Sequence, residues 1–184
     1  MHTFNFRSLF IVLAVALPMA ASAPAFAASK AELESSSKQA LNQLIAQNAG
    51  AKALNAKAVA VLVFPKVTKA GLGVGGQFGE GVLWRKGKAA GYFNTAGASY
   101  GLQAGAQQFG YAMFFMNQKA LDSLSSTQGF EVGVGPSVVV MDEGKAKNIT
   151  SGTLTEDIYA FIFSQKGLMA GLGIQGNKIT RIEK

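Results

Sequence analysis

The feature that most constrains this chain is a glycine-rich stretch that follows a buried apolar run. The run Val59–Phe64 is apolar and rich in β-branched residues, which predicts a strand buried on both faces. We expect Pro65 to end that strand, because proline cannot donate to a ladder. Glycines then recur between apolar residues from Gly71 to Gly81. Glycine inside a strand marks a bend, a bulge or a close approach of another backbone, so a tightly curved sheet is expected.

The remainder of the chain continues the same pattern. Of the 22 glycines, all but Gly50 lie at or after Gly71. Strand-like runs separated by turn residues span 89–97, 108–116, 130–141, 157–165, 168–175 and 178–182. Their short spacing predicts antiparallel hairpins, with a short helix over 117–125 and an exposed polar loop over 142–156. The expected fold is α+β, an antiparallel, glycine-rich, barrel-like curved sheet with an N-terminal helix and one short internal helix.

The N-terminal helix is expected over residues 29–49. Ser29 and Glu32 have the spacing of a capping box, and Gly50 stands where a helix-terminating glycine belongs. Leucines and one isoleucine lie along one side, which favours packing on the sheet. An interfacial membrane helix is the alternative, with Lys30 and Lys38 as its cations. Residues 52–57 are expected to add a further helical turn.

The first 27 residues have the three regions of a secretory signal peptide. A short segment with Arg7 precedes the apolar run 9–17, and Ala25-Phe26-Ala27 matches the cleavage pattern. We expect an exported protein of the periplasm or cell envelope, with a single domain over 28–184 that comprises the helix 29–49 and a sheet-rich core 53–184. The chain has no cysteine, so we expect neither disulfides nor a lipoprotein anchor.

The residue types of common catalytic sites are scarce. The one histidine, His2, lies in the predicted signal peptide, which excludes Ser-His-Asp and Cys-His catalysis and ordinary zinc sites from the mature chain. Carboxylates are few, and Glu80 stands alone within the glycine-rich stretch. Gly71-x-Gly73-x-x-Gly76 matches a dinucleotide fingerprint, but no helix start follows it. We therefore expect no enzyme, no cofactor and no metal; a hydrolase that uses Glu80 is a minor alternative.

The positive charge of the chain points to a polyanionic partner. The formal net charge is +7 and the isoelectric point is near 9.7. Lys66 and Lys69 follow the first strand. A basic tip follows the glycine-rich stretch and comprises Trp84, Arg85, Lys86 and Lys88. An ordinary solvated hairpin explains such a tip equally well, but an indole beside cations favours a membrane–water interface. Export argues against a nucleic-acid partner.

Four blocks of the sequence, in order, resemble one known family. They are AVAVLVFPKVTKAGLGVGGQFGEGVL, GASYGLQAGAQ, GFEVGVGPSV and IYAFIFSQKGLMAGLGIQGNKI, and the resemblance to the SYLF domain covers Ala53–Lys184. It implies a phospholipid-binding domain that favours phosphoinositides or other anionic lipids in eukaryotic members, some of which bind actin filaments. An amphipathic helix contributes to lipid binding in animal members, and Ser29–Asn48 occupies that place here. The chain lacks the SH3 and FYVE modules of those relatives.

These observations predict an exported, non-catalytic protein that binds anionic phospholipid at the bacterial envelope. The residues expected to carry this binding are Lys30, Lys38, Lys66, Lys69, Trp84, Arg85, Lys86 and Lys88. The alternative is a structural or interaction protein of the envelope that acts through its sheet surface or by forming a homo-oligomer.

Overall fold

The computed structural model describes residues 28–125, 129–141, 154–167 and 173–184. The predicted signal peptide and most of the predicted loop over 142–156 lie outside the described residues. The elements are α1 (Lys30–Gln47), α2 (Ala49–Lys57), β1 (Ala60–Arg85), β2 (Lys88–Phe115), α3 (Gln118–Asp122), the 3₁₀ turn η1 (Ser123–Ser125), β3 (Phe130–Glu131), β4 (Val138–Met141), β5 (Ile158–Gly167) and β6 (Lys178–Ile182).

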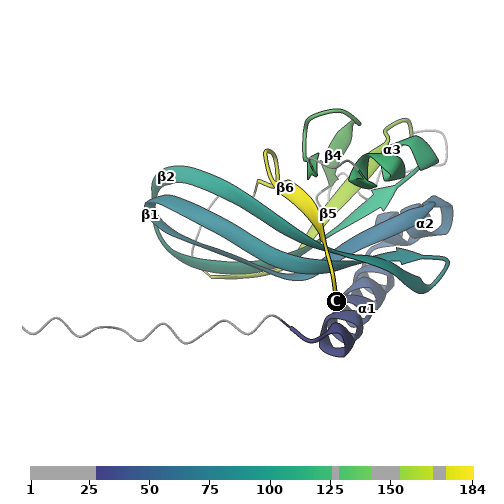
Figure 1. The fold of residues 1–184 in the computed structure, drawn as a ribbon, viewed down its shortest axis with the longest axis horizontal. Helices are drawn as coiled ribbons and strands as arrows, with labels where there is room; N and C mark the ends of the chain where they lie inside the picture. Colours follow the sequence, from purple (N-terminus) through teal and green to yellow (C-terminus); the bar gives the residue numbers. More distant parts are fainter. Residues whose placement is uncertain (1–27, 126–128, 142–153, 168–172) are drawn as a thin grey trace, which may run out of the picture.

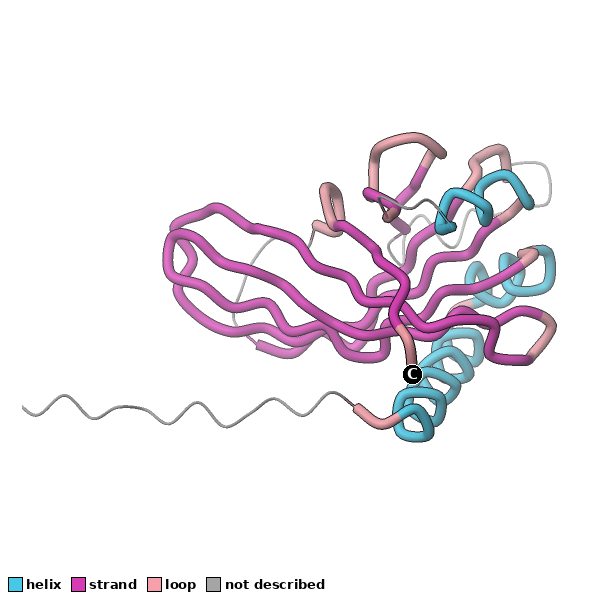
Figure 2. Tube along the Cα trace, in the orientation of Figure 1, coloured by secondary structure: helices cyan, strands magenta, loops and turns pink. Residues whose placement is uncertain are grey.

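A two-stranded ribbon of β1 and β2 organises the sheet. The strands pair antiparallel along nearly their whole length, from Ala60 opposite Phe115 to Arg85 opposite Lys88. The ribbon bends back on itself at 71–75 of β1 and the facing part of β2, so each strand has two arms (Figures 1 and 2). The predicted α+β fold with a barrel-like curved sheet is thus confirmed. The glycine fingerprint forms this bend, and β1 continues beyond it without a helix.

Glycines permit the two arms of β1 to cross. A Cβ atom on Gly79 would lie 2.7 Å from the Lys66 carbonyl oxygen, and one on Gly81 would lie 2.6 Å from the Phe64 ring. Real Cβ atoms do not approach so closely, so any other residue here would push the arms apart. The close approach predicted for the glycine-rich stretch therefore occurs within one strand.

Pro65 does not end the first strand, so that expectation is wrong. β1 runs through Pro65, and the register with β2 shifts between Phe64 and Val67. One extra residue on β1 makes this a bulge, which accommodates a residue that has no N–H for the ladder.

The first arm of β1 is buried on both faces, as predicted. Leu62 and Phe64 point into the curl and join the larger core cluster. Val61 and Val63 point the other way, into a second cluster formed with α1 and α2. The same alternation continues on β2 and β5, so a single sheet layer separates two apolar cores.

The outer strands differ from the prediction in more than one respect. The predicted strand over 168–175 lies largely outside the described residues, and its described part, 173–175, is not a strand. The sheet runs β3-β6-β2-β5-β4, with β1 paired to β2. The predicted strand over 130–141 divides into β3 and β4, and β4 pairs parallel to β5, so the described sheet is not wholly antiparallel. The short helix predicted over 117–125 is present as α3 and η1.

Helix α1 packs on the sheet, as its apolar stripe predicts. Its capping box is formed: the Glu32 N–H donates to Ser29 Oγ at 3.3 Å, and the Ser29 N–H donates to the Glu32 carboxylate at 2.9 Å. Leu33, Leu41 and Leu44 are buried. The end of the helix differs from the prediction, because Asn48 caps both α1 and α2 and Gly50 lies buried inside α2.

Candidate functional site

The basic tip is a two-residue hairpin turn between β1 and β2. Lys86 and Gly87 both have positive φ, of 50° and 76°, which is the geometry of a turn that matches the twist of paired strands. Arg85, Lys86 and Lys88 are exposed. Arg85 donates a hydrogen bond to Gln118 Oε1 at 2.9 Å, which ties the tip to α3. The hairpin therefore presents three cations from a fixed base.

Trp84 joins the tip to helix α1. Its Nε1–H donates to Ser37 Oγ at 2.8 Å, and the Lys38 ammonium lies 4.7 Å from the centroid of its ring. Trp84 is only partly exposed, because its ring packs against the second core cluster. Lys38, 46 positions earlier in the chain, thereby becomes part of the tip.

A cavity of about 460 Å³ opens beside this group, and we call it the basic cavity. Its cations are Lys38, Arg85 and Lys86, from α1 and the hairpin. Its other lining residues are the polar Asn42 and Asn55, Gly87, and the apolar Leu41, Ile45, Ala58, Val59, Ala60, Val61 and Trp84. A cavity that combines cations with apolar side chains is complementary to an amphiphile with an anionic head group.

The other predicted residues lie elsewhere. The Lys30 ammonium lies 5.3 Å from the centroid of the Tyr92 ring, next to Glu34, which accepts a hydrogen bond from the Tyr92 hydroxyl. That bond raises the pKa of Tyr92. Lys69 is only 7% exposed, so it does not belong to a solvated cationic surface. The structure therefore groups Lys38 with the tip and separates Lys30, Lys66 and Lys69 from the basic cavity.

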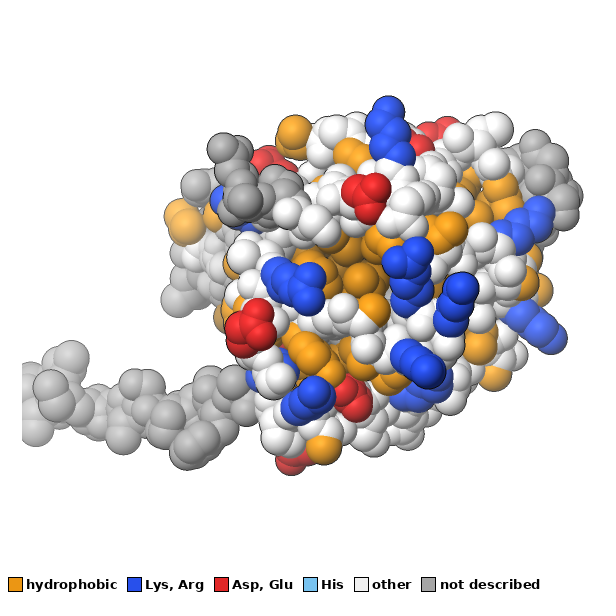
Figure 3. Space-filling view, turned by 45° about the vertical axis from the view of Figure 1, so that its right-hand side comes forward, with side chains coloured by type: hydrophobic (Ala, Val, Ile, Leu, Met, Phe, Trp, Pro, Cys, Tyr) orange, Lys and Arg blue, Asp and Glu red, His pale blue; other side chains and the backbone are white. Residues whose placement is uncertain are grey.

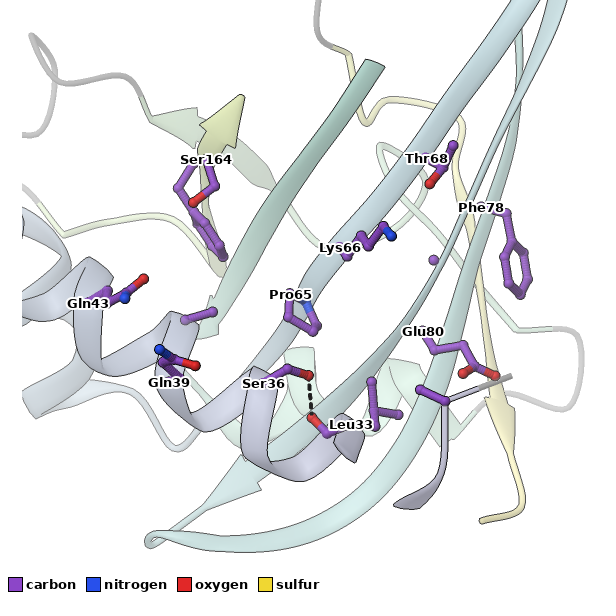
Figure 4. Close-up of a pocket in the computed structure, with 14 residues that line it drawn as sticks. Leu33, Ser36, Gln39, Gln43, Pro65, Lys66, Thr68, Phe78, Glu80 and Ser164 are labelled. Atoms are coloured by element: carbon purple, nitrogen blue, oxygen red, sulfur yellow. Dashed lines mark hydrogen bonds between the residues drawn. The ribbon is translucent and has the colours of Figure 1, made fainter. Parts of the chain in front are cut away.

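A second, larger hollow lies between α1 and the crossing of the β1 arms, and we call it the helix–sheet cavity. Its volume is about 650 Å³. Figure 4 shows Gln39 and Ser36 on the helix, Lys66 on the first arm, and Phe78 and Glu80 on the second arm. Its apolar lining residues are Ala28, Leu33, Ala40, Pro65, Phe78 and Phe163.

Two bulges shape the sheet side of the helix–sheet cavity. One is the bulge at Pro65, and the other lies on β5, where the register with β2 shifts between Gln108 and Gly110. Ser164 in that second bulge has a φ of 52°, a left-handed conformation that is uncommon for serine. Such residues cost on the order of 1–3 kcal/mol and persist only where the surroundings impose them. Both bulges line the same cavity.

Glu80 has a structural partner. Its carboxylate lies 3.0 Å from the Lys184 ammonium, which also donates to the Ala28 carbonyl oxygen at 2.7 Å. The pair is largely shielded from solvent, with side-chain exposures of 15% for Glu80 and 11% for Lys184. The end of the chain thus joins the second arm of β1 to the residues that precede α1. Among the described residues that line the helix–sheet cavity, Lys66 is the exposed cation.

The sequence pattern did not identify the helix–sheet cavity. Its lining combines residues from positions 28–43, 65–80 and 163–164, which only the fold brings together. Two features of the sequence pointed to this region: Pro65 lies between strand-like residues, and Phe78 lies among the glycines. In the structure Phe78 is 53% exposed.

Figure 3 shows one face of the molecule, on which lysine and arginine side chains and several acidic side chains lie around an exposed hydrophobic area. Within the described residues, no helix is long and apolar enough to cross a membrane. In the same part of the chain, no three acidic, histidine or cysteine side chains are grouped as a metal site would require.

Comparison with known protein families finds a match for the C-terminal part of the chain. Residues 96–184 match the family model Ysc84, which is described as Las17-binding protein actin regulator. No curated protein matches the chain. The matched segment comprises the second half of the sheet, and the basic tip and α1 lie before it. This match over residues 96–184 supports the resemblance of the chain to the SYLF domain family.

Proposed function

We propose that this protein is exported and binds anionic phospholipid at the envelope through its basic end, without catalysis. The basic end comprises Lys38, Trp84, Arg85, Lys86 and Lys88. The resemblance to the SYLF domain family is consistent with lipid binding. The predicted signal peptide and the positive net charge support an envelope location.

One observation carries the proposal. Lys38, Arg85 and Lys86 line one cavity together with apolar side chains, although they come from a helix and a hairpin far apart in the sequence. Each basic residue near an anionic membrane surface contributes about 1 kcal/mol, and the attraction acts within a Debye length of about 8–10 Å. A fixed group of this kind binds such a surface reversibly and loses affinity as the salt concentration rises.

Cosedimentation with vesicles tests the proposal. The mature protein is expected to pellet with phosphatidylglycerol vesicles at low salt, less at high salt, and not with phosphatidylcholine vesicles. The double variant Arg85→Glu, Lys86→Glu removes two favourable charges and adds two repulsive ones. Its partition coefficient should fall by about thirtyfold or more, since two lost cations alone correspond to about 2 kcal/mol.

The matched control is Lys166→Glu, Lys178→Glu. Both lysines are exposed and lie outside the basic cavity, and the change in net charge is the same. This control should retain most of the binding. Equal losses in both double variants would show a net-charge effect without a site, and equal pelleting with neutral vesicles would refute the electrostatic mechanism.

Self-association through the sheet surface is the second candidate function. Val74 at the bend of β1 and Phe78 on its second arm are exposed apolar residues, with exposures of 64% and 53%. Exposed apolar side chains on a strand that pairs on one edge are typical of a surface that meets another protein. A concentration-dependent oligomer that ignores vesicles of every charge would favour this alternative.

A further inference from the structure

We infer that the helix–sheet cavity is a second ligand site, which takes a single acyl chain with its anionic head group at Lys66. The inference extends the proposed function, because it assumes that the ligands are lipids. It differs in place and chemistry: the basic end meets a membrane surface, whereas this cavity encloses one chain. The two sites lie on different sides of α1 and share no lining residue.

The size and the lining of the cavity fit an acyl chain. Its volume of about 650 Å³ lies within the range of roughly 300–1,000 Å³ that is typical of small-molecule sites. Apolar side chains come from all sides: Leu33 and Ala40 from α1, Pro65 and Phe78 from the arms of β1, and Phe163 from β5. Besides the charged Lys66 and Glu80, the polar lining residues are the uncharged Ser36, Gln39, Gln43, Thr68 and Ser164.

The backbone supplies independent support for a built site. The strained φ of Ser164 and the bulge at Pro65 face each other across Gly110 of β2. A Cβ on Gly110 would lie 2.4 Å from the Phe163 ring and 2.9 Å from the Pro65 carbonyl oxygen, so the two bulges close on β2. Strained residues cluster where a binding function requires the geometry. Here the two interruptions of regular strand pairing, at Pro65 and at Ser164, line the same helix–sheet cavity.

The charges at the rim favour an anionic head group. Lys66 is exposed and extends from the first arm towards the second (Figure 4). The rim carboxylate, Glu80, is compensated by Lys184 at 3.0 Å. The rim therefore carries a net positive charge, which suits the carboxylate of a fatty acid or the phosphate of a lysophospholipid. Phe78 and Val74 continue an exposed apolar line along β1 from the cavity.

Direct binding to delipidated mature protein tests the inference. Oleate and lysophosphatidylglycerol are the two probes. Their binding is measured by the displacement of a fluorescent fatty acid and by the rise in the melting temperature of the protein. Saturable binding of one molecule per chain is expected. The probe with the higher affinity identifies the source of the chain, a free fatty acid or a membrane lipid. Absence of saturable binding by both probes would overturn the inference.

Filling the cavity should abolish this binding. Ser36 is exposed and points into the cavity from α1, so Ser36→Phe occupies the space without removing a core residue. The adjacent Ser35 is also exposed but does not line the cavity, which makes Ser35→Phe the matched control. Ser36→Phe should bind oleate at least about tenfold more weakly, and Ser35→Phe should bind normally. Equal affinities of the two variants would refute the site.

The role of Lys66 requires a comparison of ligands. Lys66→Glu should weaken the binding of oleate but not that of the uncharged oleyl alcohol, and Lys52→Glu on α2, with the same change in net charge, should affect neither. Equal weakening of both ligands would exclude a head-group contact.

A diazirine-tagged fatty acid provides a test that needs no variant. It should crosslink to the lining residues of the helix–sheet cavity, and crosslinks confined to the basic cavity would overturn the assignment.

Vesicle binding and acyl-chain binding should be lost in different variants. Arg85→Glu, Lys86→Glu should lose vesicle binding and still bind oleate, whereas Ser36→Phe should bind vesicles and lose oleate. Vesicle binding without oleate binding would refute the acyl-chain site alone.

Discussion

At the scale of single residues, the fold depends on positions where a side chain is absent or a polar group is held. Gly79 and Gly81 are required by close backbone contact, since neither has a positive φ. Asp157 holds three segments together: it accepts from Asn117 Nδ2 at 2.7 Å and from the Ser137 N–H at 3.2 Å. Asn117 in turn caps α3 by accepting from the Ala120 N–H at 2.8 Å.

Gly79→Ala should destabilise the protein by about 1–3 kcal/mol, the usual cost of overpacking. The added Cβ would lie 2.7 Å from the Lys66 carbonyl oxygen and 2.8 Å from Val67 Cγ2, so the arms of β1 must separate. Gly76→Ala is the control, because its Cβ would lie 3.8 Å from the nearest atom. Urea unfolding measures the difference, and equal stability of the two variants would contradict the crossing of the arms.

Asp157 should make stability depend on pH in acid. Hydrogen bonds from Asn117 and Ser137 lower the pKa of Asp157 below its ordinary value of 3.8. Because the folded-state pKa is the lower one, its contribution is complete above pH 3.8 and declines as the pH falls through the folded-state value. Asp157→Asn should reduce the melting temperature at pH 7. It should also make the melting temperature depend less on pH below pH 3.8. An unchanged acid dependence would show that the carboxylate is not held.

At the scale of elements, α1 and β1 show how far local patterns determine structure. The capping box and the apolar stripe predicted α1 and its packing correctly, because both signals are local. The end of α1 and the continuation of β1 through Pro65 were predicted wrongly. Asn48 was able to cap two helices, and a bulge absorbed the missing N–H of proline, both within a tertiary context that overrides local preference.

Ser29→Ala should destabilise the protein by about 1 kcal/mol, because the first turn of α1 loses its side-chain acceptor. The change should also remove the larger of the two hydrogen bonds that lower the pKa of Glu32, the one from the Ser29 hydroxyl at 2.7 Å; the bond from the backbone N–H remains. Thermal unfolding measures the first effect and NMR titration of the Glu32 side chain the second. Ser35→Ala, at an exposed position inside the helix, is the control and should be neutral or stabilising.

At the scale of the whole molecule, the curled sheet separates two apolar cores and places the two candidate sites on either side of α1. The first arm of β1, its partner in β2, and β5 lie between the cores and are covered on both faces. The bend of the ribbon lies away from α2 and carries the exposed Val74 (Figure 1).

This arrangement predicts the order of hydrogen exchange. Amides of 111–115 in β2 should exchange most slowly, since this segment pairs with β1 on one side and β5 on the other and lies between the two cores. Amides near Val74 should exchange fastest within the ribbon. Native-state exchange followed by mass spectrometry measures the order, and slower exchange at the bend than at 111–115 would contradict the two-core architecture.

The sequence by itself determined the α+β class, the curved glycine-rich sheet, the capped helix and the basic hairpin, because composition, spacing and turn residues act locally. The tertiary structure alone decided that Lys38 joins the tip while Lys69 is buried, that β1 bends back over itself, and that a cavity forms between α1 and the two bulges. Those outcomes depend on contacts between residues tens of positions apart, and no local pattern encodes which distant backbone will pass over a given glycine.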